Sequence, residues 1–130
     1  MSEQKEEKKD SLQSYLQAFT GSPTQEQIDA WKTQYGEVFV SGFSENELYV
    51  WRAVTRPEWV SLQSLINNPE AKMTQYKFEE MLCDVCVLWK SVTKSWSDGK
   101  AGTASSLHEQ ILQNSNFLSP QAASYLVAKL

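Results

Sequence analysis

The stretch Glu37-Val-Phe-Val-Ser-Gly-Phe-Ser-Glu-Asn-Glu-Leu-Tyr-Val-Trp-Arg-Ala53 decides the fold that we expect for this 130-residue chain. In residues 37–41 and 47–53 the residue pattern has a period of two, and β-branched and aromatic side chains dominate. Residues 42–46 contain the glycine, serine and asparagine that are typical of a turn. The stretch therefore predicts a β-hairpin.

Both faces of the second arm of this hairpin carry apolar side chains. Leu48 and Val50 lie on one face of the strand, whereas Tyr49 and Trp51 lie on the other. A strand of this kind can be covered on both sides by other parts of the chain. Because two strands are too few to make an independent sheet, the hairpin needs helices to pack against it.

Helix signals precede the hairpin. Thr24 with Gln27 forms a capping box, and Ser22 with Gln25 offers the same arrangement two residues earlier. Gly36 is a natural left-handed stop at the end of such a helix. We therefore expect one helix between this cap and Gly36.

Two more helices are expected directly after the hairpin. The capping box Thr55-Arg56-Pro57-Glu58 starts a helix that the prolyl segment at residues 67–69 ends. A longer helix is expected from near Glu70 or Thr74 to Lys90, as the central element of the fold. Its broad apolar face would contain Phe78, Leu82, Val85, Cys86 and Trp89.

The remainder of the chain predicts an exposed loop and two further helices. Residues 95–102 contain two glycines and should form the loop. Thr103 is expected to cap the first helix, and Ser119-Pro120 caps the last. The last helix would carry Ala123, Leu126, Val127 and Leu130 on one face.

These elements predict an α+β fold, a mostly helical single domain with one β-hairpin. We expect this domain to span residues 22–130, a length sufficient to bury most of a hydrophobic core. Residues 1–21 would precede it as a charged leader and a short amphipathic helix. The leader has no apolar segment typical of a signal peptide, so we expect the chain to stay where it is translated.

The short helix of this leader carries an apolar stripe. Leu12, Tyr15, Leu16 and Phe19 recur at helical spacing, and Gly21 ends the segment. The stripe must be buried either on the chain's own core or on a neighbouring chain. Both alternatives are open from the sequence, so these four residues are candidates for partner binding.

The charge pattern argues against nucleic acid and membrane as partners. The net charge is −4, and the basic residues are dispersed among acids rather than gathered into a stripe. The longest apolar stretches, such as residues 85–89, fall far short of the roughly 20 residues that span a bilayer. We therefore expect a soluble chain in a reducing cytoplasm.

Two motifs could carry chemistry, and we expect neither to do so. Cys83 and Cys86 form a C-x-x-C pair, but no second cysteine pair exists and His108 is the chain's only histidine. Both cysteines lie inside an apolar helical run, which favours buried thiols that act as small hydrophobic side chains. His108 is expected to be an exposed helical residue. No catalytic, cofactor-binding or metal-binding residue is therefore assigned, and no cofactor is expected.

Two further polar features receive structural interpretations. Glu79 and Glu80 point in different directions on a helix and are expected to be surface charges. Arg52 could bind the carboxylate of a partner or brace Glu58, and we favour the bracing role.

Trp96 is the best candidate for an exposed aromatic anchor. It lies between Ser95 and Ser97 in the predicted loop, whereas the other four tryptophans follow inward-facing patterns. Aromatic anchors are enriched in protein–protein contacts. We therefore place Trp96 among the candidate partner-binding residues.

The order of several short motifs resembles small proteins encoded in the tail gene clusters of tailed bacteriophages. The resemblance covers roughly residues 23–118 and is carried by degenerate apolar, capping and arginine patterns. These are Pro23-Thr24, Gln27-Ile28, Trp31-Lys32, Tyr35-Gly36-Glu37-Val38-Phe39, Trp51-Arg52-Ala53-Val54-Thr55-Arg56, Glu58, Phe78-Glu79-Glu80, Cys83, Cys86-Val87-Leu88-Trp89, Ala101-Gly102, Leu107, Ile111-Leu112 and Ser115-Asn116-Phe117. Similar chains have a proline after the aromatic residue where this one has Trp89-Lys90, so the helix is expected to run longer here.

The resemblance implies a tail assembly chaperone or a baseplate protein related to those of T4-like phages, and no enzyme. Its partners would be other tail or baseplate proteins, with the tape-measure protein as one option, and the chain would be an oligomer within an assembly. It would act in the host cytoplasm during assembly, and a baseplate component would remain in the virion. The alternative is a small metal- or redox-linked regulatory protein that uses Cys83 and Cys86.

Overall fold

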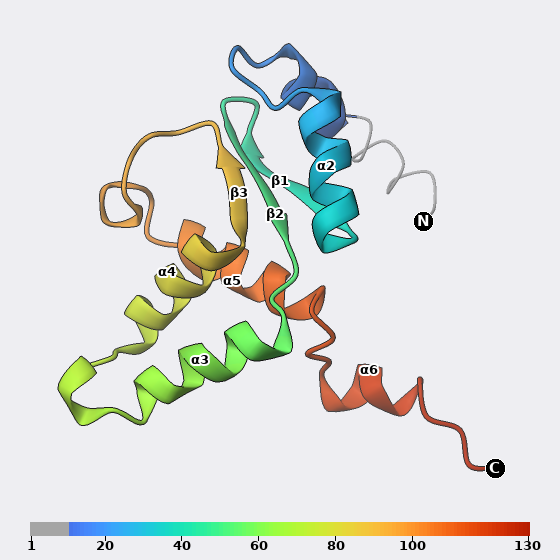
Figure 1. Cartoon of the computed structure of the whole chain (residues 1–130), viewed down its shortest axis with the longest axis vertical. Helices are drawn as coiled ribbons and strands as arrows, with labels where there is room; N and C mark the ends of the chain where they lie inside the picture. The colour runs from blue at the N-terminus through green and yellow to red at the C-terminus, as the bar shows by residue number, and fades with distance from the viewer. Residues whose placement is uncertain (1–10) are drawn as a thin grey trace.

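A three-stranded antiparallel sheet lies at the centre of residues 11–130, the part of the chain that this computed structural model describes (Figure 1). The strands are β1 (Val38–Ser44), β2 (Glu47–Arg52) and β3 (Val87–Lys90), in the order β1-β2-β3. Helices pack on both faces of the sheet, so the α+β fold class expected from the sequence is confirmed.

The helices lie before, between and after the strands. They are α2 (Gln25–Tyr35), α3 (Arg56–Ile66), α4 (Gln75–Cys86), α5 (Thr103–Gln113) and α6 (Pro120–Ser124), with the short turns η1 (Pro69–Ala71) and η2 (Trp96–Asp98). A further helical segment spans residues 11–18. Residues 1–10, which form the expected charged leader, lie outside the described part.

The predicted hairpin is confirmed, with a shorter turn than expected. β1 and β2 are paired from Val38 opposite Arg52 to Ser44 opposite Glu47, and a bulge lies between Gly42 and Ser44. Residues 45 and 46 alone form the turn. Both strands are therefore held in one register over nearly their whole length.

The expected long helix ends at Cys86 and not at Lys90, so this prediction was wrong over its last turn. Val87 has the extended backbone angles φ −74° and ψ 120°, and the chain continues as β3. Trp89 pairs with Val50 of β2 instead of continuing the helical apolar face. The longer helix expected at Trp89-Lys90 is wrong for the same reason, because pairing with β2 satisfies the backbone groups of this segment.

The last helix is also shorter than predicted. α6 begins with a hydrogen bond from the Ala122 backbone to the Ser119 hydroxyl at 3.2 Å, as the cap predicts, but it ends at Ser124. Leu126 and Val127 lie beyond it and are highly exposed, as is Leu130. The apolar stripe expected to face the core contacts little of the domain.

The caps of α2, α3 and α4 follow the sequence closely, whereas α5 begins at Thr103 with Gly102 as its cap, so the predicted Thr103 cap was wrong. Thr24 and Gln27 form the capping box of α2, and Gly36 ends this helix at φ 89°. The Glu58 carboxylate accepts a hydrogen bond from the Thr55 backbone at 3.0 Å at the start of α3. Thr74 caps α4, which was one of the two predicted starting points.

β2 separates two hydrophobic clusters, as the apolar character of both its faces predicted. Tyr49 and Trp51 face the larger cluster, which α3, α4 and α5 complete with Leu62, Phe78, Leu82, Cys83, Cys86, Leu107 and Ile111. Leu48 and Val50 face the smaller cluster, where Leu16 is the third buried residue. Within residues 11–130 no helix is long and apolar enough to cross a membrane.

Candidate functional site

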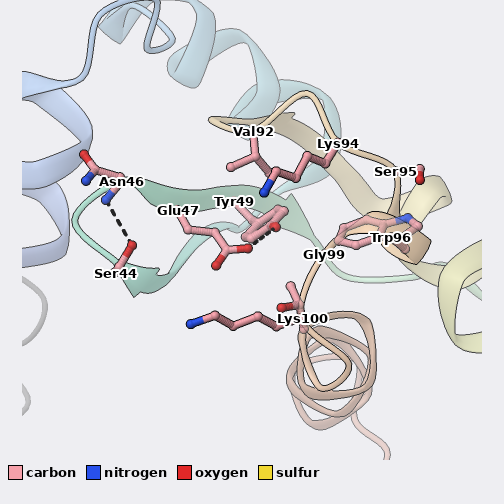
Figure 2. Close-up of a pocket in the computed structure, with 11 residues that line it drawn as sticks. Ser44, Asn46, Glu47, Tyr49, Val92, Lys94, Ser95, Trp96, Gly99 and Lys100 are labelled. Atoms are coloured by element: carbon pink, nitrogen blue, oxygen red, sulfur yellow. Dashed lines mark hydrogen bonds between the residues drawn. The ribbon is translucent and has the colours of Figure 1, made fainter.

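A cleft lies between the hairpin turn and the chain that follows β3 (Figure 2). Its volume is about 220 Å³. It is lined by Ser44, Asn46, Glu47, Tyr49, Val92, Lys94, Ser95, Trp96, Gly99, Lys100 and Thr103. We call it the Trp96 cleft.

Hydrogen bonds of Ser91 fix the start of the chain segment after β3 to the hairpin. The Ser91 hydroxyl accepts a hydrogen bond from the Leu48 backbone at 2.8 Å and donates one to the Asn46 carbonyl at 3.0 Å. The Ser91 backbone N–H also donates to the Leu48 carbonyl at 2.9 Å. The segment that leaves β3 therefore starts from a fixed point, which positions Trp96 over β2.

The floor of the Trp96 cleft is a pair of stacked aromatic rings. The ring centroids of Tyr49 and Trp96 are 5.6 Å apart at an interplanar angle of 27°. The Trp96 indole N–H donates to the Asp84 carboxylate on α4 at 2.8 Å, and the Lys90 ammonium lies 5.1 Å from its ring centroid. Trp96 is partly buried and packs against the larger hydrophobic cluster, so it is less exposed than the sequence predicted.

Tyr49 places a hydrogen-bonded hydroxyl group in the cleft. The Tyr49 hydroxyl donates to the Glu47 carboxylate at 2.9 Å, and burial together with this bond raises the pKa of Tyr49 well above its usual value. Lys94 and Lys100 extend on the two sides of Glu47 and Tyr49 (Figure 2). The Tyr49 phenol therefore keeps its proton at neutral pH.

The predicted partner-binding residues divide between this cleft and the opposite face of the sheet. Trp96 lies in the cleft, whereas Leu16 is buried and Leu12 packs against the smaller cluster beside it. The Phe19 ring meets the Trp89 ring edge-on at 5.8 Å. Tyr15 is 42 % exposed and is the most accessible of the four stripe residues. Leu12 and Leu16 of the stripe therefore pack on the chain's own core and not on a neighbouring chain.

Cys83 and Cys86 are completely buried on α4 in the larger cluster. Burial raises the pKa of each thiol to about 12, so both thiols are protonated at neutral pH. Among residues 11–130 no group of three or more histidine, cysteine, aspartate or glutamate side chains could hold a metal ion. This geometry does not support the metal- or redox-linked alternative.

His108 is buried, so the expectation of an exposed histidine was wrong. It is 8 % exposed, its ring meets Phe78 edge-on at 5.9 Å, and its Nε2 atom has no hydrogen-bond partner among the described residues. Burial lowers the pKa of His108, while the charges of Glu79 and Glu109 oppose that shift. His108 thus extends from α5 and packs against Phe78 of α4.

Glu79 is also buried rather than a surface charge. It is 8 % exposed, and its carboxylate accepts a hydrogen bond from the Ser105 hydroxyl at 3.0 Å. Neither Glu79 nor His108 lines the Trp96 cleft. These groups were missed because nothing in the local pattern of α4 shows that α5 covers this side of the helix.

The bracing role of Arg52 is confirmed. Its Nη2 atom donates to the Glu58 carboxylate at 2.8 Å, and the two side chains form an ion pair. Arg52 also donates to the Val85 carbonyl at 3.0 Å. The guanidinium is thus used within the domain.

Together the fold and the cleft define a small α+β domain with an aromatic-floored cleft that two lysines rim. Comparison of the chain with protein-family models, with curated proteins and with solved structures finds no match.

Proposed function

We propose that this chain is a non-enzymatic bacteriophage tail or baseplate assembly protein that acts through protein–protein contacts. It would serve either as a baseplate component of the virion or as a tail assembly chaperone. The observation that carries the binding role is the Trp96 cleft, where stacked aromatic rings lie between two lysines. Aromatic residues framed by polar groups are typical of binding surfaces.

The bacteriophage setting is supported by the resemblance over roughly residues 23–118. A transient chaperone and a virion component differ in what the finished particle contains. Mass spectrometry of purified virions separates the two roles, because a baseplate component is present there and a chaperone is absent.

The binding role is tested by affinity purification of the tagged chain from infected cells. We expect tail or baseplate proteins, with the tape-measure protein as one candidate, to be recovered with it. Recovery of no virion or assembly protein contradicts the proposal, as does a measurable turnover that His108→Ala abolishes.

The place of binding is tested by charge reversal at the cleft. Lys94→Glu with Lys100→Glu should lower the recovery of the partner severalfold, because both side chains rim the cleft and are exposed. The matched control is Lys72→Glu with Lys77→Glu, two exposed lysines, the first just before α4 and the second in its first turn. If both double variants recover the partner equally, the cleft is not the contact, whatever the partner is.

A further inference from the structure

Residues 110–130 are almost free of charge, unlike the remainder of the described chain. They contain one charged side chain, Lys129, whereas residues 11–109 contain twelve carboxylates and eight lysines or arginines. An uncharged surface segment of this length offers little to a partner that binds through electrostatics. It suits a partner with an apolar surface.

Ile111 of this segment is buried in the larger cluster, whereas the apolar side chains after α6 are displayed to solvent. Tyr125 is 90 % exposed, Leu126 is 73 % exposed and Val127 is 76 % exposed. Figure 1 shows α6 and the chain after it extending away from the helices and sheet. We call residues 125–130 the C-terminal arm.

A hollow at the junction of α5 and α6 lies next to this arm in the sequence. Its volume is about 770 Å³, and its apolar lining comes from Leu112, Phe117, Leu118 and Ala122. Glu109 is its only charged lining residue, and Glu109 is exposed and forms no ion pair among the described residues. We call it the α5–α6 hollow.

The arm and the hollow are complementary in both polarity and charge. The arm brings apolar side chains and one cation, Lys129, while the hollow brings apolar side chains and one anion, Glu109. The high exposure of Tyr125, Leu126 and Val127 means that the arm does not fill the hollow of its own chain. Every copy of the chain therefore carries both halves of the same contact.

We propose that the chain forms a homodimer in which the C-terminal arm of each copy fills the α5–α6 hollow of the other. Lys129 of one copy then pairs with Glu109 of the other, twice in the dimer. Such a reciprocal exchange has two-fold symmetry and closes on itself, so it gives a dimer rather than a filament. The proposal does not depend on the proposed function.

The test is sedimentation equilibrium of the purified full chain over a range of concentrations. The wild type should approach twice the chain mass of 14.8 kDa. Leu126→Asp should give a monomer, since it places a charge in the apolar contact. Val60→Asp is the matched control, because Val60 is 53 % exposed on α3, away from the contact, and should leave the dimer intact.

The charge pairing is tested by reversal and rescue. Glu109→Lys and Lys129→Glu alone should each weaken the dimer about two- to thirtyfold, because each substitution removes both copies of an exposed ion pair. The double variant should recover most of that loss. A monomeric wild type, a dimer that Leu126→Asp leaves unchanged, or a double variant that recovers nothing would each overturn the proposal.

Discussion

Arg52 joins four elements of the fold through one guanidinium group. It extends from β2, forms an ion pair with Glu58 of α3, donates to the Val85 carbonyl of α4, and lies 4.6 Å from the ring centroid of Tyr35 in α2. Arg52 itself is 7 % exposed. A buried cation that loses its anion is left with an uncompensated charge.

Glu58→Gln should therefore lower the free energy of unfolding by about 1–3 kcal/mol, the range for a hydrogen bond to a charged group. Chemical denaturation at neutral pH measures the loss. Glu45→Gln is the control, because Glu45 lies exposed in the hairpin turn and should change stability by less than about 0.5 kcal/mol. Equal effects of the two substitutions would show that the ion pair contributes nothing.

The ion pair between Arg52 and Glu58 also predicts how the free energy of unfolding depends on pH. The hydrogen bond from Arg52 lowers the pKa of Glu58 from 4.5 to about 2. The Glu58 carboxylate thus binds a proton more weakly in the folded state than in the unfolded state. The stabilisation by the ion pair is therefore complete above about pH 4.5 and is lost as the pH falls toward 2. Glu58→Gln should flatten this part of the stability profile relative to the wild type.

The two cysteines should be unreactive in the folded chain. Both are completely buried, and burial raises the pKa of each thiol to about 12. An aromatic disulfide reagent should therefore label neither thiol at neutral pH and should label both in denaturant. Rapid labelling of the native chain, or bound zinc in stoichiometric amount, would favour the metal- or redox-linked alternative.

At the scale of elements, the missing side chain of Gly42 lets the segment of residues 11–18 lie close to the sheet. A Cβ atom at Gly42 would lie 2.6 Å from the Leu12 Cδ2 atom and 3.0 Å from the Leu48 Cδ2 atom. We expect Gly42→Ala to lower the melting temperature, because Leu12 must move and Leu48 is fully buried.

Gly99→Ala is the control for this substitution. The nearest heavy atom to its added Cβ is 3.6 Å away, which is an ordinary contact. Its melting temperature should be unchanged or slightly raised, since alanine reduces the freedom of the unfolded chain. A melting temperature of Gly42→Ala equal to that of Gly99→Ala would mean that residues 11–18 do not pack as described.

The elements that the sequence predicted well are those with local signals. The caps at Thr24 and Thr55, the stop at Gly36 and the alternation in β2 all depend on neighbouring residues. β3 was missed because Trp89 continues the helical period of α4, and no glycine or proline marks the end of that helix. Pairing with β2 decides the outcome, and this contact is distant in sequence.

The candidate site was predicted only in part for the same reason. Trp96 could be singled out from its loop, but Tyr49 and Glu47 become its neighbours only because β3 returns the chain to β2. The end of α6 was overestimated because an apolar period alone does not make a helix. Such a stripe needs a surface to pack against, and the domain gives it little.

At the scale of the whole molecule, the two hydrophobic clusters share β2 and should unfold together. Leu48→Ala, in the smaller cluster, should lower the free energy of unfolding by about 2–5 kcal/mol, the range for a fully buried leucine. Circular dichroism, which reports mostly on helices, and tryptophan fluorescence should give one coincident transition. Two separate transitions would show that residues 11–21 and the smaller cluster form an independent unit.

The burial of β2 on both faces also governs how the chain can vary. From Leu48 to Arg52 every residue is buried, with exposures of 0 to 7 %, so these five positions of β2 do not face water. A saturation mutagenesis library should therefore show five consecutive positions that do not tolerate substitution. In an ordinary amphipathic strand, tolerant and intolerant positions alternate. Divergence among descendants of this gene would be confined to the helices and loops, while this short tract stays almost fixed.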